Sequence, residues 1–320
     1  MMVTEKQILE AAEIIRNGGL VAFPTETVYG LGANALDAKA VTSIFATKER
    51  PSFDPLIVHI CKTEDIRRLS LEEDARVYTL AHHFWPGPLT IVVPKSSLVP
   101  EIVTSGLSSV GLRMPDNEIA LKLIDLAGCP IAAPSANKFG KLSPTTAEHV
   151  RKQLPELECI LDGGNTSVGV ESTVITLETD GFVILRHGAI TAKDLIKYVP
   201  QSKKKDIFAL AAASPGMMKS HYSPEKPVYI IGEHEIPSDK SEAGLLSFGG
   251  TSNGEYKKVE FLSANQNLQE AAVNLFGALH KLEESDVGFI VSEAVPETGI
   301  GIAIMDRLRK AAYRFQKNNS

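Results

Sequence analysis

Two basic side chains, Lys48 and Arg50, lie two residues apart at the end of a predicted helix, in a segment that is rich in hydroxyl groups. Residues 20–60 run from an apolar strand into the glycine-containing loop PTETVYGLG, then into that helix and into a second strand that carries His59. Fixed cations, hydroxyl groups and flexible backbone at the end of a buried strand suit an anionic ligand, in particular a phosphate. Alternatively, Lys48 and Arg50 form an exposed basic helix end that interacts with the helix dipole.

Other polar residues follow further predicted strands. Ser135 and Asn137 lie in the turn APSAN and can hydrogen-bond phosphate or a base edge, although ordinary turns use the same residues. Arg113 and Arg186 each end an apolar strand and could pair with a carboxylate or lie on the surface. Ser172 follows a glycine-rich stretch. Because open α/β sheets bind ligands at strand ends, we expect these residues to form one site.

The sequence lacks the motifs of several common enzyme classes. It has no G-x-x-x-x-G-K-[ST] phosphate loop and no zinc-ligand spacing, and the G-x-G at 299–301 does not continue into a dinucleotide-binding motif. His82 and His83 fit a solvated helix face. We also find no Ser–His–Asp set, acid pair or reactive cysteine. The chemistry would therefore come from positioning reactants and neutralising phosphate charge, as in nucleotidyl and phosphoryl transfer.

Composition narrows the class of protein. The chain has 320 residues, of which 43% are hydrophobic and 22% charged, and this suits a soluble protein of two domains. A net charge of −6 argues against a protein that mainly coats nucleic acid. Cys61, Cys129 and Cys159 are isolated and read as reduced core thiols of a cytoplasmic protein. The N-terminus resembles an amphipathic helix rather than a signal peptide, and no apolar run could span a membrane.

Helices alternate with apolar strands, which predicts an α/β fold in two units. Residues 1–199 would form a catalytic domain on a twisted, open, mixed sheet, and residues 228–320 a smaller Rossmann-like α/β domain. Residues 200–227 contain four prolines and no periodic pattern, so they read as a linker that partly docks. If the site closes before reaction, the part around 215–224 is a candidate lid, with Gly216 among the possible hinges. Predicted helix N-caps are Thr4, Asp37, Asp116 and Thr145.

The ordered set PTETVYGLG, the K-x-R at 48–50, PLIVHI, APSAN and ESTV resembles the threonylcarbamoyl-AMP synthases. The resemblance covers the whole chain, since SPGMMKSHYSP is similar to the linker of the two-domain members and GIGIAIMDRLRKAA to their C-terminal domain. It implies a YrdC-like catalytic domain that condenses L-threonine, bicarbonate and ATP into threonylcarbamoyl-AMP and pyrophosphate. The product supplies the threonylcarbamoyl group of tRNA adenosine beside the anticodon, so the tRNA threonylcarbamoyltransferase machinery is an implied downstream partner.

The resemblance also implies residue roles. Lys48 and Arg50, the catalytic pair, would hold the ATP phosphates together with Mg²⁺. The other expected nucleotide contacts are Asp54, Ser109, Ser135, Asn137, Ser143, Arg186 and Tyr222. The expected L-threonine pocket consists of Thr27, His59, Arg113, Ala133 and Ser172, with Arg113 facing the carboxylate. Relatives usually carry Asn where this chain has Asp54, so this carboxylate would either contact the metal indirectly or point away from the phosphates.

Two other functions remain open from the sequence. An RNA-binding module could take tRNA directly, with slight support from the lysines at 203–205. Such a module would show salt-dependent RNA affinity without consuming ATP. A carbamoyltransferase that uses carbamoyl phosphate is the third possibility, because related domains occur in such enzymes. The two-domain layout and the linker motif disfavour it.

Overall fold

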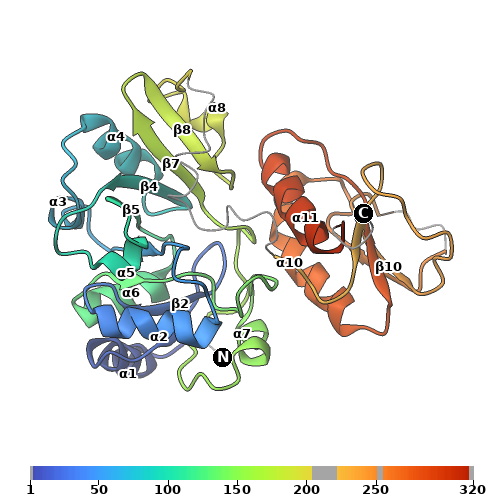
Figure 1. Cartoon of the computed structure of the whole chain (residues 1–320), viewed down its shortest axis with the longest axis horizontal. Coiled ribbons are helices and arrows are strands. Elements are labelled where there is room, and N and C mark those ends of the chain that lie inside the picture. The colour runs from blue at the N-terminus through green and yellow to red at the C-terminus, as the bar shows by residue number, and fades with distance from the viewer. Residues whose placement is uncertain (1–2, 204–221, 251–254, 317–320) are drawn as a thin grey trace.

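The computed structural model describes residues 3–203, 222–250 and 255–316, which form two α/β units, each built on its own sheet (Figure 1). The larger sheet has eight strands in the order β1-β2-β6-β3-β5-β4-β7-β8 and mixes parallel with antiparallel pairs. The predicted mixed α/β fold is therefore confirmed. The strands are β1 (Val21–Phe23), β2 (Gly30–Asn34), β3 (Ile57–His59), β4 (Leu89–Pro94), β5 (Ser109–Arg113), β6 (Ile131–Ala132), β7 (Thr173–Glu178) and β8 (Gly181–Arg186).

Strand β3 lies near the middle of this sheet and brings the polar residues together. It runs parallel to β5, with His59 opposite Arg113. On its other side it runs antiparallel to β6, with His59 opposite Ile131. The chain after β6 therefore passes the beginning of β3, where the N–H of Ala133 donates to the carbonyl of Ile57. Residues from both ends of β3 thus lie along one face of the sheet.

Helices cover the larger sheet, and several of them begin at a residue whose side chain caps the helix N-terminus. Helix α1 has a capping box in which the Thr4 hydroxyl and the Gln7 side chain satisfy each other's backbone N–H, and its apolar face packs on α6. As predicted, Asp37 caps α2, and its side chain accepts hydrogen bonds from the backbone N–H groups of Lys39 and Ala40. The helices are α1 (Glu5–Arg16), α2 (Ala38–Lys48), α3 (Asp65–Leu69), α4 (Ala75–Phe84), α5 (Glu101–Thr104), α6 (Glu118–Ala127), α7 (Ala147–Gln153) and α8 (Ala192–Leu195).

Three local predictions were wrong. The caps expected at Asp116 and Thr145 are Asn117 and Thr146, one residue later in each case. Strand β2 was taken for part of a loop because its sequence, GLGAN, has little strand propensity. Its small residues are needed there, since a Cβ at Gly32 would come within 2.7 Å of side chains on both neighbouring strands.

The second unit is a four-stranded parallel sheet in the order β11-β10-β12-β9, covered by two long helices. The smaller α/β domain is therefore confirmed, whereas its proposed limits at residues 199 and 228 stay a prediction. Among the described residues, no helix is both long and apolar enough to cross a lipid bilayer. The elements are β9 (Val228–Ile230), β10 (Ala243–Ser247), β11 (Lys258–Phe261), α10 (Leu268–Glu284), β12 (Phe289–Ser292) and α11 (Gly301–Gln316).

Helices α10 and α11 lie on the side of the second unit that faces the first (Figure 1). Val28, Leu142 and Val170 of the larger unit belong to the same buried apolar cluster as Phe276 of α10. The approach is close, because a Cβ on Gly169, which has φ +78°, would lie 2.3 Å from a backbone oxygen of α10. The two units therefore share a packed interface and are not merely tethered.

Two neutral histidines lie in this interface. The ring of His149 on α7 stacks on that of His280 on α10, with centroids 3.8 Å apart. The backbone N–H of Thr145 donates to Nδ1 of His149 over 3.2 Å, and Nε2 of His280 lies 3.1 Å from the carbonyl oxygen of Ser143. Burial lowers the pKa of His149 to about 3 and that of His280 to about 4. Protonation of either ring would thus disrupt the contact.

This histidine pair predicts a loss of stability in acid. Both folded pKa values lie below the unfolded value of 6.5, so the unfolded chain binds more protons between about pH 4 and that value. The stabilisation is present above pH 6.5 and is lost as the pH falls through this window. The double variant His149→Asn/His280→Gln keeps hydrogen-bonding groups but does not titrate at these positions. We expect its melting temperature to fall on acidification by a few degrees less than that of the wild type. Melting curves across this range provide the measurement.

The exposed His82 on α4 supplies the matched control. A His82→Asn variant should follow the wild-type melting temperature at every pH. If the double variant keeps the wild-type pH dependence, the stacked pair does not control the stability of the interface.

Candidate active site

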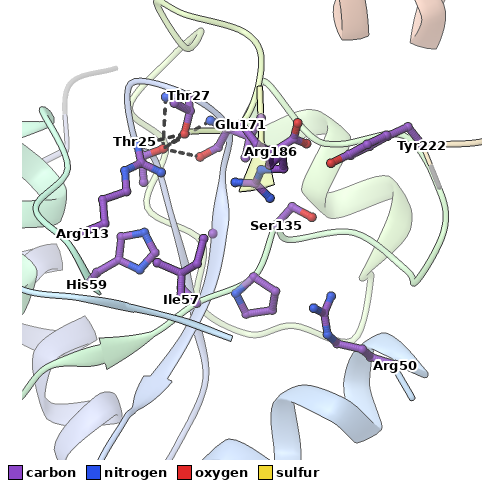
Figure 2. Close-up of a pocket in the computed structure, with 14 residues that line it drawn as sticks. Thr25, Thr27, Arg50, Ile57, His59, Arg113, Ser135, Glu171, Arg186 and Tyr222 are labelled. Carbon is purple, nitrogen blue, oxygen red and sulfur yellow. Dashed lines mark hydrogen bonds between the residues drawn. The ribbon is translucent and has the colours of Figure 1, made fainter. Parts of the chain in front are cut away.

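A pocket opens over β3, and its walls come from distant parts of the chain (Figure 2). It contains eight of the residues predicted for the site: Thr27, Arg50, His59, Arg113, Ala133, Ser135, Arg186 and Tyr222. Figure 2 shows Thr27, His59 and Arg113 at one end and Arg50 and Tyr222 at the other. Six predicted residues do not line it: Lys48, Asp54, Ser109, Asn137, Ser143 and Ser172.

At the first end, a buried arginine is held by the loop after β1. Nη2 of Arg113 lies 2.7 Å from Oε1 of Glu26 and donates to Oγ1 of Thr27 over 3.0 Å. Burial and the neighbouring Arg113 charge lower the pKa of His59 to about 3, so its imidazole is neutral. Nδ1 of His59 is buried and has no hydrogen-bond partner among the described residues. This end therefore offers a fixed guanidinium beside a neutral ring nitrogen, which suits a ligand with both a carboxylate and a polar neighbouring group.

At the opposite end, Arg50 is fixed by the residues that follow it. Glu49 ends α2 in a left-handed conformation with φ 53°, which directs Arg50 away from the helix and into the pocket. The guanidinium donates to the carbonyl oxygens of Asp54 and Pro55 over 3.2 and 3.1 Å, and its Nη2 lies 2.8 Å from Oδ2 of Asp54. Asp54 therefore turns toward Arg50.

Lys48 lies behind the pocket wall. Its Nζ donates to the carbonyl oxygen of Ser135 over 2.6 Å and to that of Asn137, and the side chain is buried. Burial and the charge of Arg50 lower the pKa of Lys48. The Asn137 amide in turn donates to the carbonyl oxygens of Lys138 and Lys141. Through these hydrogen bonds, Lys48 and Asn137 stabilise the turn that carries Ser135.

The middle of the pocket is organised by Arg186 and Glu171. Arg186 donates to the backbone oxygen and to Oγ of Ser172 over 3.1 and 3.0 Å. Oγ of Ser143 donates to Oε1 of Glu171 over 2.5 Å. The predicted residues Ser143 and Ser172 thus contact the pocket wall without lining it. Thr25 and Glu171 do line it and were missed, although both stand inside quoted motifs, PTET and ESTV.

Ser109 and Tyr222 need separate comment. Ser109 begins β5, opposite Pro94, and lines a small neighbouring cleft that shares Ile57 with the main pocket. Tyr222 is buried, has φ 58° and lines the pocket. Of the proposed lid at 215–224, residues 215–221, with the hinge Gly216, lie outside the described residues.

Comparison with known proteins agrees with this architecture. A family model described as "Telomere recombination" matches residues 13–188, and one described as the C-terminal domain of threonylcarbamoyl-AMP synthase matches residues 190–313. A relative named threonylcarbamoyl-AMP synthase from Pyrococcus abyssi is 45% identical over 98% of this chain and 97% of its own. The chain belongs to the threonylcarbamoyl-AMP synthase family. The relative of the same name from Bacillus subtilis is 40% identical over 98% of this chain and 94% of its own.

Solved structures extend the family assignment to the fold. The structure of P. abyssi Sua5 complexed with L-threonine matches with a TM-score of 0.87 and 43% identity, over 98% of this chain and 96% of that one. E. coli YciO matches with a TM-score of 0.52 at 22% identity, over 60% of this chain and 94% of that one, and so shares the fold alone. The larger unit of this synthase family member therefore has the YrdC-like fold that the motifs implied.

The pocket of this family member offers no ready-made metal cage. The described residues contain no group of three His, Cys, Asp or Glu side chains placed to hold an ion. Glu171 faces Arg307 and Asp54 faces Arg50, so each carboxylate is already opposite a guanidinium. Such a site fits a divalent cation that arrives on the ligand's own phosphates, as Mg²⁺ often does.

The pairing of Asp54 with Arg50 leads to a prediction about anion binding. The variant Asp54→Asn keeps the shape of the side chain and removes its charge. We expect it to bind inorganic triphosphate roughly threefold to tenfold more tightly, because Arg50 then presents an unopposed charge. The ligand-free variant should lose about 2 kcal/mol of stability, because a buried ion pair loses its anion. Isothermal titration and thermal melts measure the two effects.

Asp37→Asn is the matched control, because Asn caps a helix as well as Asp does and this cap lies at the opposite end of α2. Unchanged or weaker triphosphate binding by Asp54→Asn would show that Asp54 does not offset the charge of Arg50.

Proposed function

We propose that this protein is an L-threonylcarbamoyladenylate synthase, which condenses L-threonine, bicarbonate and ATP into threonylcarbamoyl-AMP and pyrophosphate. One observation carries the proposal. A single pocket presents Arg113 beside a neutral His59 at one end and Arg50 at the other (Figure 2). The first end suits an amino acid and the second a polyphosphate, so the arrangement suits a reaction that joins the two.

The threonine end would recognise both charged groups of the amino acid. Arg113 would pair with the α-carboxylate, and its contacts with Glu26 and Thr27 hold the guanidinium in place before substrate arrives. The unpartnered Nδ1 of His59 would meet the amine or hydroxyl group of threonine. Because the imidazole stays neutral, it adds no repulsion toward the ammonium group.

At the nucleotide end, Arg50 would face the phosphates, and Ser135, Arg186 and Tyr222 would line the rest of the nucleotide site. Lys48 would act mainly through the turn that it anchors. When Mg²⁺ accompanies the triphosphate, it neutralises phosphate charge. After its ammonium group has released a proton to solvent, the threonine amine attacks CO₂ with loss of a second proton, or attacks bicarbonate with loss of water, to give a carbamate. A carbamate oxygen then attacks the α-phosphorus as the bond to pyrophosphate breaks. The buried walls of the pocket limit the water that could destroy the carbamate.

The product would leave as an activated carbamoyl adenylate. An enzyme that transfers the threonylcarbamoyl group to adenosine in tRNA must consume it, and we propose that this transfer machinery is the downstream partner. A weak contact with tRNA stays a prediction, since of the three lysines that suggested it only Lys203 is described. The three free cysteines suit the reducing cytoplasm, where we place the protein.

The decisive experiment measures pyrophosphate released from ATP without any RNA. We expect release to require both L-threonine and bicarbonate, and mass spectrometry to find threonylcarbamoyl-AMP among the products. An RNA-binding module would release no pyrophosphate, and a carbamoyltransferase would respond to carbamoyl phosphate. Folded protein that stays inactive with Mg²⁺, ATP, threonine and bicarbonate would overturn the proposal.

The role of Arg113 can be tested by Arg113→Lys, which keeps the charge but removes the forked geometry. We expect the KM for threonine to rise about 10- to 100-fold, because a two-point contact to the carboxylate becomes a single one. The KM for ATP should stay within about twofold, because the nucleotide end is unchanged. Steady-state kinetics with each substrate varied in turn provide the measurement.

Arg151→Lys, at a surface ion pair with Asp162, is the matched control and should leave both KM values unchanged. If Arg113→Lys raised the KM for ATP more than the KM for threonine, Arg113 would contact ATP rather than threonine, contrary to the proposal.

A further inference from the structure

We propose that Arg307, on helix α11 of the second unit, is a positioning residue for the nucleotide side of the pocket. This inference rests on the proposed synthase function. The described residues that line the pocket all lie at or before Tyr222, so the second unit supplies none of them directly. The most direct influence of that unit on the reaction would pass through residues that both touch it and line the pocket.

Arg307 makes such a contact with Glu171. Its Nε lies 3.0 Å from Oε2 of Glu171, and its Nη1 donates to the carbonyl oxygen of His187 over 2.8 Å. Nη1 also donates to Oδ2 of Asp306 over 2.9 Å. The Arg307 side chain has 0% exposure, so these contacts form in a dry environment between the units. A guanidinium with several fixed partners has little freedom to turn, and it holds the carboxylate that it faces.

Glu171 carries this constraint into the pocket. One of its oxygens faces Arg307, and the other accepts the 2.5 Å hydrogen bond from Ser143. Burial alone would raise the pKa of Glu171, but the charges of Arg307 and Arg186 and the Ser143 hydroxyl outweigh burial and lower it. Glu171 is therefore an anion that needs a cation. If Arg307 were absent, the cation that still acts on Glu171 would be Arg186, which also lines the pocket. Arg307 thus keeps Glu171 from drawing Arg186 away from the nucleotide.

The same arginine supports a second pocket residue. The guanidinium carbon of Arg307 lies 5.4 Å from the centroid of the Tyr222 ring, within the range of a cation–π contact. Phe276 of α10 packs against Tyr222 as well, with ring centroids 5.5 Å apart. Tyr222 lines the pocket and precedes β9, which begins at Val228. The second unit therefore supports the nucleotide side through both Glu171 and Tyr222, whereas Arg113 and His59 lie at the other end (Figure 2).

The test compares Arg307→Met, Arg307→Lys and Arg309→Met in the full-length chain. Arg309 lies on the same helix but is exposed and pairs with Glu233 and Glu297. We expect Arg307→Met to raise the KM for ATP about 10- to 100-fold, because ATP would lose contacts with the displaced Arg186 and Tyr222, and the loss of a hydrogen bond to a charged group weakens binding by about this factor. The KM for threonine should change less than about threefold. Arg307→Lys should recover part of the loss, and Arg309→Met should match the wild type.

A merely structural role gives a different result. Arg307→Met would then lower the active fraction and the apparent kcat while leaving both KM values unchanged, and this outcome would overturn the inference. So would a wild-type KM for ATP in folded Arg307→Met. If Arg307→Met does not fold, the more conservative Arg307→Lys decides by the same split between the two KM values.

A double-mutant cycle with Glu171→Gln separates the pathway from other effects. Glutamine keeps an acceptor for Ser143 and needs no cation, so Arg307→Met should cost much less in this background than in the wild type. An equal cost in both backgrounds would exclude Glu171 as the link. Direct titration of each protein with a non-hydrolysable ATP analogue adds a readout that needs no turnover. If the wild type makes no product, the proposed function fails, whereas the analogue titrations still test Arg307.

Discussion

The structure depends on burying arginines in pairs with carboxylates that the fold brings to them. Arg50, Arg113 and Arg307 are almost completely buried, and each faces an acidic residue: Asp54, Glu26 and Glu171. Removing such a charge from water costs several kcal/mol, which attraction offsets only when the geometry is good. The loop after β1 places Glu26 next to Arg113, and the turn after α2 places Asp54 next to Arg50. Arg307 reaches Glu171 from the second unit. Backbone carbonyls complete the arrangement, so each guanidinium is held before any ligand binds.

This arrangement explains why the two units pack tightly. Glu171 is buried in the larger unit, but its principal cation belongs to the smaller one. The interface that contains this buried ion pair also holds apolar side chains from both units and the stacked histidines, and burial away from water strengthens the charge interaction. The interface is therefore part of the electrostatics of the pocket. A second unit that was only tethered by a linker could not hold the Arg307 guanidinium in a fixed orientation.

Sequence reasoning predicted the two α/β units and eight of the residues that line the pocket, but it missed Thr25 and Glu171, which stand inside motifs that it had quoted. It failed where the outcome depended on tertiary contact. Strand β2 forms despite its sequence because its glycine at Gly32 leaves room for the side chains of Phe23 on β1 and Ile131 on β6. Lys48 and Arg50 were expected to act together, but the left-handed Glu49 between them sends one side chain behind the wall and the other into the pocket. The partner of Glu171 is 136 residues away in the chain, and no local pattern could have indicated it.

The charge in the pocket also limits what can fill it. Among the described residues, three arginines and one glutamate line its walls. Lys48 lies just behind them, and burial is the main cause of its lowered pKa. A triphosphate together with an amino-acid carboxylate carries more negative charge than these walls compensate. Since the described residues provide no metal cage, a divalent cation bound to the phosphates would supply the remaining positive charge. Conversely, an unpaired Asp54 would add to the repulsion, whereas Asp54 held against Arg50 has its charge largely neutralised within the wall. The pairing of carboxylates with arginines thus makes an acidic protein able to hold a strongly anionic ligand in a buried site.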